Sequence, residues 1–271
     1  MGRWKVRDVH LHVVERGSGP PLLLVHGFPL DHAMWAAQLE DLSRDARVIA
    51  PDLRGFGASD SGGDVVLMED FADDLAALLD VLGIAEPVVF CGLSMGGYIA
   101  WQFVRRHRAR LRGLVLCGTR AAADAPVAAE ARRVNAERVL REGAGFLADA
   151  MLEKLVAAET RQRRPDLVAA LRRTVLAASP QGLAAALRGM AARPDASPWL
   201  PQMELPALVV CGSEDALSSV EEMRGLANRL PQARFVEIAG AGHLSPLEQP
   251  PAVNAAVRSF LALPELSTAR R

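Results

Sequence analysis

The heptapeptide Cys91-Gly92-Leu93-Ser94-Met95-Gly96-Gly97 decides the fold of this chain. It contains Gly-x-Ser-x-Gly and joins an apolar run at residues 87–91 to a helix-spaced segment that extends to residue 107. A sharp turn from a strand into a helix forces its central serine into strained backbone angles and pushes the hydroxyl outward, while small flanking residues supply the room. The helix that follows points its N-terminus at the hydroxyl, which favours developing negative charge. The segment therefore predicts a nucleophilic Ser94.

A glycine-rich turn with a passive serine is the alternative interpretation of this segment. A phosphate-binding loop fits less well, because Gly92, Gly96 and Gly97 do not match G-x-G-x-x-G and no Walker lysine follows. A nucleophilic serine needs a base, and the base needs an acid that orients it. The rest of the chain has to supply both.

His243 is the predicted base. It lies in Gly240-Ala241-Gly242-His243-Leu244-Ser245-Pro246, a loop of small residues after the last predicted strand. Such a loop can bring an imidazole over the carboxyl edge of the sheet, where Ser94 is expected. We assign the other histidines to exposed strand positions, turns or a helix end: His10, His12, His26, His32 and His107.

Asp215 is the predicted acid. The segment Cys211-Gly212-Ser213-Glu214-Asp215 follows the preceding predicted strand, so the chain order is serine, acid, histidine. Glu214 stays open as an alternative acid. Asp215 is preferred because a side chain needs a few residues of loop beyond the strand before it can turn towards the histidine.

Two backbone amides are expected to bind the oxyanion of a tetrahedral intermediate. One is the N–H of Met95, directly after the serine. The other comes from His26-Gly27-Phe28-Pro29, the loop after the run at residues 21–25. Pro29 has no N–H, so Phe28 is the predicted donor, and His26 is expected to brace the loop.

Asp52 follows a further predicted strand and could be mistaken for the catalytic acid. We interpret it as a carboxylate that fixes the turn around Gly55 and Gly57. The histidines are scattered and the cysteines isolated, so no metal site is expected, and the chemistry proposed for Ser94 needs no other cofactor.

Apolar runs and helix-spaced segments alternate along the chain, which predicts an α/β fold with a mostly parallel sheet and helices on both faces. The predicted strands are residues 6–15, 21–25, 47–50, 87–91, 114–117, 207–211 and 234–238, and the predicted helices 71–82, 94–107, 221–230 and 252–261. Alternation stops near Thr119. We expect a core of residues 1–119 and 201–271, with residues 120–200 forming a helical insertion, and frayed residues 267–271.

The 31 basic and 32 acidic residues give a net charge of −1, so no broad field would attract nucleic acid or an anionic membrane. No segment has the pattern of a signal peptide or a membrane span. Cys91, Cys117 and Cys211 each end an apolar run, which predicts buried thiols and favours a cytoplasmic location. Self-association stays open.

Together these motifs resemble the α/β-hydrolase superfamily over nearly the whole chain, from about residue 6 to residue 261. The matching segments are His26-Gly27-Phe28, Asp52-Leu53-Arg54-Gly55-Phe56-Gly57, Gly92-Leu93-Ser94-Met95-Gly96-Gly97, Asp215 and Gly242-His243. The resemblance implies an eight-stranded sheet with a helical cap inserted after the sixth strand. Ser94 argues against the dehalogenases and epoxide hydrolases of this superfamily, which carry an aspartate at this turn.

Within the superfamily the chain looks most like the 3-oxoadipate enol-lactonase and carboxylesterase group. The similar segments are Ser179-Pro180-Gln181-Gly182, residues 191–195 and residues 205–210. Leu183 departs from the group, whose members often carry an aromatic residue there. An enol-lactone with free carboxylates would need a cationic pocket, for which Arg120 and Arg193 are candidates; solvated surface positions are the interpretation we favour for both.

The resemblance implies a serine hydrolase that cleaves a small ester or lactone through an acyl-enzyme on Ser94, with His243 as base and Asp215 as its partner. Three alternatives use the same framework. They are a hydrolase of carbon–carbon bonds in diketones, a cofactor-free perhydrolase, and a catalytically silent ligand-binding protein.

Overall fold

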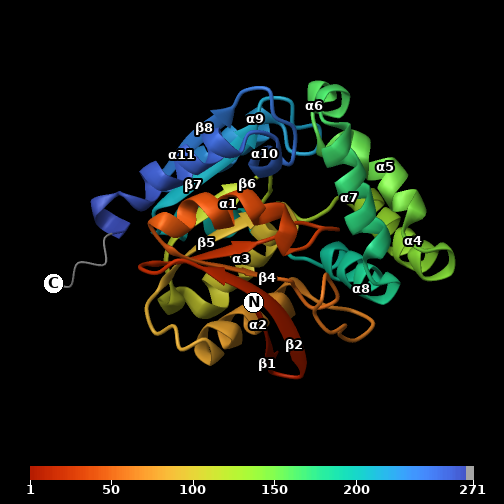
Figure 1. Ribbon diagram of the computed structural model, residues 1–271, viewed down its shortest axis with the longest axis horizontal. Helices are drawn as coiled ribbons and strands as arrows, with labels where there is room; N and C mark the ends of the chain where they lie inside the picture. Colours follow the sequence, from red (N-terminus) through yellow and green to blue (C-terminus); the bar gives the residue numbers. More distant parts are fainter. Residues whose placement is uncertain (267–271) are drawn as a thin grey trace.

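Eight strands form one sheet in the computed structural model, which describes residues 1–266, in the order β1-β2-β4-β3-β5-β6-β7-β8 (Figure 1). The strands are β1 Gly2–Val6, β2 Val9–Arg16, β3 Pro21–Val25, β4 Arg47–Pro51, β5 Val88–Leu93, β6 Leu111–Cys117, β7 Ala207–Gly212 and β8 Ala233–Ile238. The pairs β1–β2 and β2–β4 are antiparallel, and the others are parallel. Every residue of β3, β5 and β7 is buried, as expected of strands covered on both faces. The predicted mostly parallel sheet is confirmed.

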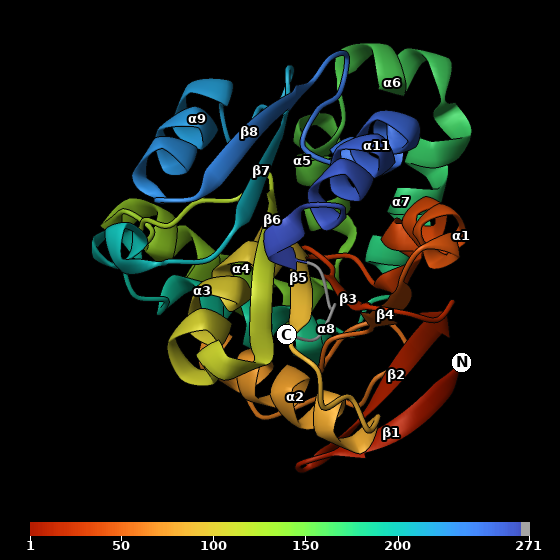
Figure 2. The same cartoon turned by 90° about the vertical axis from the view of Figure 1, so that its left-hand side faces the viewer.

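Helices cover both faces of this sheet. They are α1 Ala36–Asp41, α2 Met68–Val81, α3 Met95–His107, α9 Val220–Arg229, α10 Ser245–Glu248 and α11 Pro250–Leu261. Figure 2 shows α1 and α11 on one face and α2, α3 and α9 on the other. Fully buried Phe71, Phe103 and Phe260 pack from α2, α3 and α11. Their burial makes the hydrophobic effect the main force that holds these helices on the sheet.

Five α-helices lie between β6 and β7: α4 Pro126–Glu142, α5 Gly145–Leu155, α6 Ala158–Arg163, α7 Pro165–Ala177 and α8 Pro180–Ala191. Figure 1 shows them gathered at one side of the sheet. Proline occupies the first turn of α4, α7 and α8, where its missing N–H leaves no bond unmade. We refer to these five helices as the cap.

The α8 helix of the cap packs on the segment after β4 through two glycines one heptad apart. A Cβ on Gly182 would lie 1.9 Å from the Gly55 carbonyl oxygen, and a Cβ on Gly189 would lie 1.8 Å from that of Val66. Between them the Val66 N–H donates to the Ala185 carbonyl at 3.2 Å. Gly182, in the enol-lactonase-like segment, therefore has a packing role.

The predicted antiparallel strand over residues 6–15 is confirmed for residues 9–15, which lie in β2, but its start is wrong, because residues 2–16 form a hairpin. Val6 pairs with Val9, and the chain reverses at Arg7 and Asp8. Arg7 takes a φ of 52° and bonds through its guanidinium to Asp74 at 3.1 Å. No glycine or asparagine marks this turn, so the alternation of polar and apolar residues continues through it undisturbed.

Cys91, Cys117 and Cys211 are buried free thiols, as predicted. No helix within residues 1–266 has both the length and the apolar character needed to cross a bilayer. The expected fraying of residues 267–271 lies outside the residues that the structure describes.

Candidate active site

Ser94 lies in a tight turn between β5 and α3, with φ 53° and ψ −110°. Gly92 and Gly96 on either side of Ser94 have to be glycines, because other backbone segments approach them closely. A Cβ on Gly92 would lie 2.4 Å from the Gly96 carbonyl oxygen, and one on Gly96 would lie 2.4 Å from that of Val25. The left-handed backbone of a non-glycine residue costs free energy, which the surrounding strands and helix must supply. The strained turn predicted from the heptapeptide is confirmed.

His243 and Asp215 form a buried pair. The Nδ1 atom of His243 lies 2.9 Å from Oδ2 and 3.1 Å from Oδ1 of Asp215. Asp215 Oδ1 also accepts the N–H groups of Leu217 and Ser218, at 2.8 and 2.9 Å. Glu214 is exposed. The structure therefore brings Asp215, and not Glu214, to the imidazole, with the carboxylate oriented by its own loop.

Ser94 and His243 meet at one cavity of about 180 Å³ under the cap. Its lining also includes Phe28, Tyr98, Arg120, Arg132, Met151, Met190, Leu217 and Ser218. These lining side chains come from the carboxyl edge of the sheet and from the cap. Open α/β sheets bind their ligands at the carboxyl edge. A second hollow of about 490 Å³ lies at the opposite edge, beside Pro21 and Arg47 at the starts of β3 and β4.

The two expected oxyanion donors are both near Ser94. Met95 is the first residue of α3, where the amides of a helix have no carbonyl partner within the helix. Phe28 lines the cavity, and a Cβ on the preceding Gly27 would lie 3.3 Å from the Ser94 Cβ. Glycine at position 27 thus allows this loop to approach the serine.

His26 braces the loop that carries Phe28, as predicted. Its Nε2 accepts the Leu53 N–H at 3.0 Å, so Nδ1 carries the proton and donates to the Gly27 carbonyl at 3.0 Å. Burial lowers the pKa of His26 below its ordinary value. A neutral, fully buried imidazole therefore joins the loop after β3 to the loop after β4.

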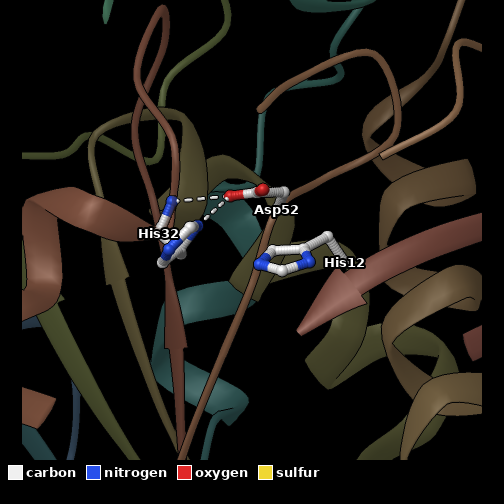
Figure 3. Close-up of side chains that lie close together, drawn as sticks. All are labelled: His12, His32 and Asp52. Carbon is white, nitrogen blue, oxygen red and sulfur yellow. Dashed lines mark hydrogen bonds and ion pairs between the residues drawn. The ribbon is translucent and has the colours of Figure 1, made fainter. Parts of the chain in front are cut away.

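Asp52 fixes the turn after β4, also as predicted. Its Oδ1 accepts the N–H and the Nδ1–H of His32, at 2.8 and 2.6 Å (Figure 3), and its Oδ2 accepts the Ala58 N–H at 2.9 Å. Burial alone would raise the pKa of Asp52, but the bonds from His32 and Ala58 hold it below its ordinary value. The hydrogen bond to Asp52 raises the pKa of His32, against the effect of burial.

Figure 3 shows His12 beside this pair, and ligand atoms of the three side chains lie within 4.8 Å of one another. A divalent cation at this position would compete with the three N–H donors that Asp52 already accepts. Two of these donors belong to His32 in the segment after β3, and the third is the Ala58 N–H in the turn after β4. We therefore interpret the cluster of His12, His32 and Asp52 as a clamp on the turn.

The interpretation of Arg193 as a solvated surface residue is wrong. Its side chain is 3% exposed, donates to Asp124 at 2.8 Å and stacks over the Tyr98 ring, 4.1 Å from the ring centroid. Arg120 is half-buried and lines the cavity, while its guanidinium reaches the Leu217 carbonyl and, at 3.2 Å, Glu222. Neither arginine is free in solvent.

Four residues important to the site escaped the sequence analysis. Gly118 has φ 47°, and a Cβ there would lie 3.0 Å from His243 Nδ1 and 3.1 Å from Asp215 Oδ2. Thr119 donates from Oγ1 to the Ser94 carbonyl at 2.8 Å. Arg132 lines the cavity, and Glu248 bonds to the loop of His243. The signal for Gly118 was its place directly after the apolar run that ends at Cys117.

The fold of this chain has counterparts among known proteins. A family model described as alpha/beta hydrolase fold matches residues 20–250, and the chain belongs to this family of hydrolases. A solved structure of a thermophilic esterase from Thermogutta terrifontis, with malate bound, has a TM-score of 0.95 and 48% identity, covering 96% of this chain and 98% of that one.

Enol-lactonases are also similar to this chain. The crystal structure of the enol-lactonase from Burkholderia xenovorans LB400 has a TM-score of 0.90 and 32% identity, covering 97% of this chain and 100% of that one. The 3-oxoadipate enol-lactonase 2 of Acinetobacter baylyi is 27% identical over 94% of each chain. The resemblance stated from the motifs is confirmed at the level of the family and its esterase and lactonase members.

Proposed function

We propose that this chain hydrolyses carboxylic esters or lactones through an acyl-enzyme on Ser94. The observation that carries the proposal is the buried His243–Asp215 pair, 2.9 Å apart, beside the same cavity as Ser94. The esterase and enol-lactonase names of relatives that span nearly the whole chain support the choice of substrate.

In the proposed mechanism, His243 Nε2 takes the proton of the Ser94 hydroxyl as its oxygen attacks the substrate carbonyl carbon. The N–H groups of Met95 and Phe28 bind the resulting oxyanion. The tetrahedral intermediate collapses, the C–O bond to the leaving alkoxide breaks, and the imidazolium returns the proton to it. Water then attacks the acyl-enzyme with His243 again as base, which releases the acid and restores Ser94. Asp215 holds the imidazole tautomer and stabilises the imidazolium.

The test is hydrolysis of p-nitrophenyl acetate and butyrate by the wild type and by Ser94→Ala. We expect Ser94→Ala to lose at least about a thousandfold in kcat, as the removal of a triad serine does. Ser218→Ala is the matched control, because Ser218 lines the same cavity. This variant should lose far less kcat than Ser94→Ala. An inert wild type, or equal activity of Ser94→Ala, contradicts the proposal; turnover of a vinylogous diketone would then support the carbon–carbon hydrolase.

We further propose that the preferred substrate carries a carboxylate away from the scissile bond. Arg132 lines the cavity, and its Nε donates to Asp124, a carboxylate 4% exposed, at 2.5 Å. Arg193 donates a hydrogen bond to the other carboxylate oxygen of Asp124. Burial alone would raise the pKa of Asp124, but Arg193 and Arg132 hold it below its ordinary value. Two guanidinium groups against one carboxylate leave one positive charge beside the cavity, whereas Arg120 is paired with Glu222.

The expected result is a higher kcat/KM for a half-ester such as monoethyl succinate than for neutral diethyl succinate. Arg132→Gln should reduce this preference about tenfold, the effect of one charge-assisted contact of about 1.4 kcal/mol, with p-nitrophenyl acetate hydrolysis little changed. Arg133→Gln is the control, because Arg133 is the next residue of α4 and is exposed. An unchanged preference in Arg132→Gln would contradict the assignment.

A further inference from the structure

Glu248 is a buried carboxylate outside the proposed catalytic triad. It is the last residue of α10, and its side chain lies beneath the surface between the loop of His243 and the cap. Its Oε1 accepts the Gly242 N–H at 2.9 Å. Its Oε2 accepts the Ala157 N–H at 2.8 Å and the Thr160 hydroxyl at 2.7 Å.

These bonds join two segments that are distant in sequence. Gly242 directly precedes His243, and Ala157 and Thr160 belong to the start of α6 in the cap. On the other side of the histidine, the Leu244 N–H donates to the Leu155 carbonyl at 2.9 Å. Both neighbours of His243 are therefore bonded, directly or through Glu248, to residues 155–160.

The close approach of the two segments leaves no space for adjustment. A Cβ on Gly242 would lie 2.6 Å from the Ala157 nitrogen and 3.1 Å from Glu248 Oε1. On its opposite side the same loop rests on the end of β7, where the Glu214 N–H donates to the Ala241 carbonyl at 2.8 Å. The His243 backbone is thus clamped between the sheet and the cap, and Glu248 supplies the cap side of the clamp.

We propose that Glu248 is a positioning residue for His243, which fixes the imidazole relative to Ser94 by bonding the histidine loop to the cap. Its kinetic consequences rest on the function proposed above. A displacement of about 1 Å of a catalytic group can cost about a hundredfold in rate, so a carboxylate that never contacts the substrate can control kcat.

The chemistry of the three bonds requires a carboxylate. All three partners are donors, and an ionised carboxylate offers acceptor sites on both oxygens. A glutamine has one acceptor oxygen, so its NH₂ group would face either the Gly242 N–H or the Ala157 N–H, donor against donor. The isosteric change Glu248→Gln therefore breaks one side of the bridge while it preserves the volume of the side chain.

The experiment compares Glu248→Gln with Asp74→Asn. Asp74 is a different buried carboxylate on α2, which is bonded to Arg54 and lies far in sequence from the His243 loop. Both variants should lower Tm. We expect kcat for p-nitrophenyl butyrate to fall tenfold to about a hundredfold in Glu248→Gln, with KM changed less than threefold, and both constants to stay near wild type in Asp74→Asn. Thr160→Val, which removes one of the three donors, should lower kcat by a smaller factor.

A second measurement does not depend on ester turnover. We expect the proton on His243 Nδ1, bonded to Asp215, to give a far-downfield proton NMR resonance that shifts or broadens in Glu248→Gln and stays unchanged in Asp74→Asn. Wild-type kcat together with an unshifted resonance in Glu248→Gln would overturn the proposal, as would equal changes in Asp74→Asn. If the wild type hydrolyses no ester, the function proposed above fails, and the resonance alone decides the role of Glu248.

Discussion

At the residue scale, three buried carboxylates organise the loops around the site in the same way. Asp52, Asp215 and Glu248 each accept backbone N–H groups of the loops beside them, and each is also bonded to a side chain or a segment from elsewhere. Loops that leave a sheet edge have amides with no strand partner, and an unpaired buried amide costs about 1–3 kcal/mol. Each carboxylate thus holds a loop in one conformation.

The His32–Asp52 bond predicts a pH-dependent contribution to stability. Since the bond raises the pKa of His32 above the unfolded value of 6.5, the folded state binds this proton more tightly. The contribution is therefore complete below about pH 6.5 and is lost as the pH rises through the pKa of the folded state. The Tm difference between wild type and His32→Gln should be larger at about pH 5.5 than at about pH 8.5. A difference that grows with pH would contradict this.

At the scale of elements, the turn from β5 into α3 is the most constrained part of the fold. Gly92 approaches Gly96, and Gly96 in turn approaches the end of β3, so three elements meet with backbone against backbone. The position of Ser94 depends on this contact, because nothing larger than hydrogen fits at either glycine. The predicted consequence is that a methyl group at position 96 destabilises the protein and displaces the serine.

Gly96→Ala should lower the free energy of unfolding by about 2 kcal/mol or more, since its Cβ would lie 2.4 Å from the Val25 carbonyl oxygen. Gly225→Ala is the matched control. Gly225 lies exposed within α9 with no atom within 4 Å of its Cβ position, so alanine there should stabilise by about 0.5–1 kcal/mol. Urea unfolding of both variants measures the difference, and equal stability of the two would count against the packing at the turn.

Elements with a buried face were predictable from the sequence, and the turn at Arg7 was not. The predicted strand at residues 207–211 is β7, Ala207–Gly212, because a fully covered strand must be a continuous apolar run. Arg7 takes its positive φ without glycine, supported by the distant Asp74. A contact with a residue so far along the chain leaves no local signal.

At the scale of the whole molecule, the site is assembled from the sheet edge and the cap. Ser94, Asp215 and His243 follow strands β5, β7 and β8, and the order of motifs along the chain was enough to propose them. Arg132 and Glu248 could not be found in this way. One is an arginine among many in the cap, and the other is a glutamate whose partners in the cap lie about ninety residues away. Their surroundings arise only when cap and core pack together.

In the proposed mechanism, Ser94 carries the acyl group during turnover. The most direct measurement is intact-protein mass spectrometry after reaction with a p-nitrophenyl organophosphate, followed by peptide mapping. We expect one stoichiometric adduct on the peptide that contains Ser94, its absence from Ser94→Ala, and much slower formation in His243→Ala. An adduct that forms equally in Ser94→Ala, or ester turnover by a wild type that never becomes labelled, would contradict this mechanism.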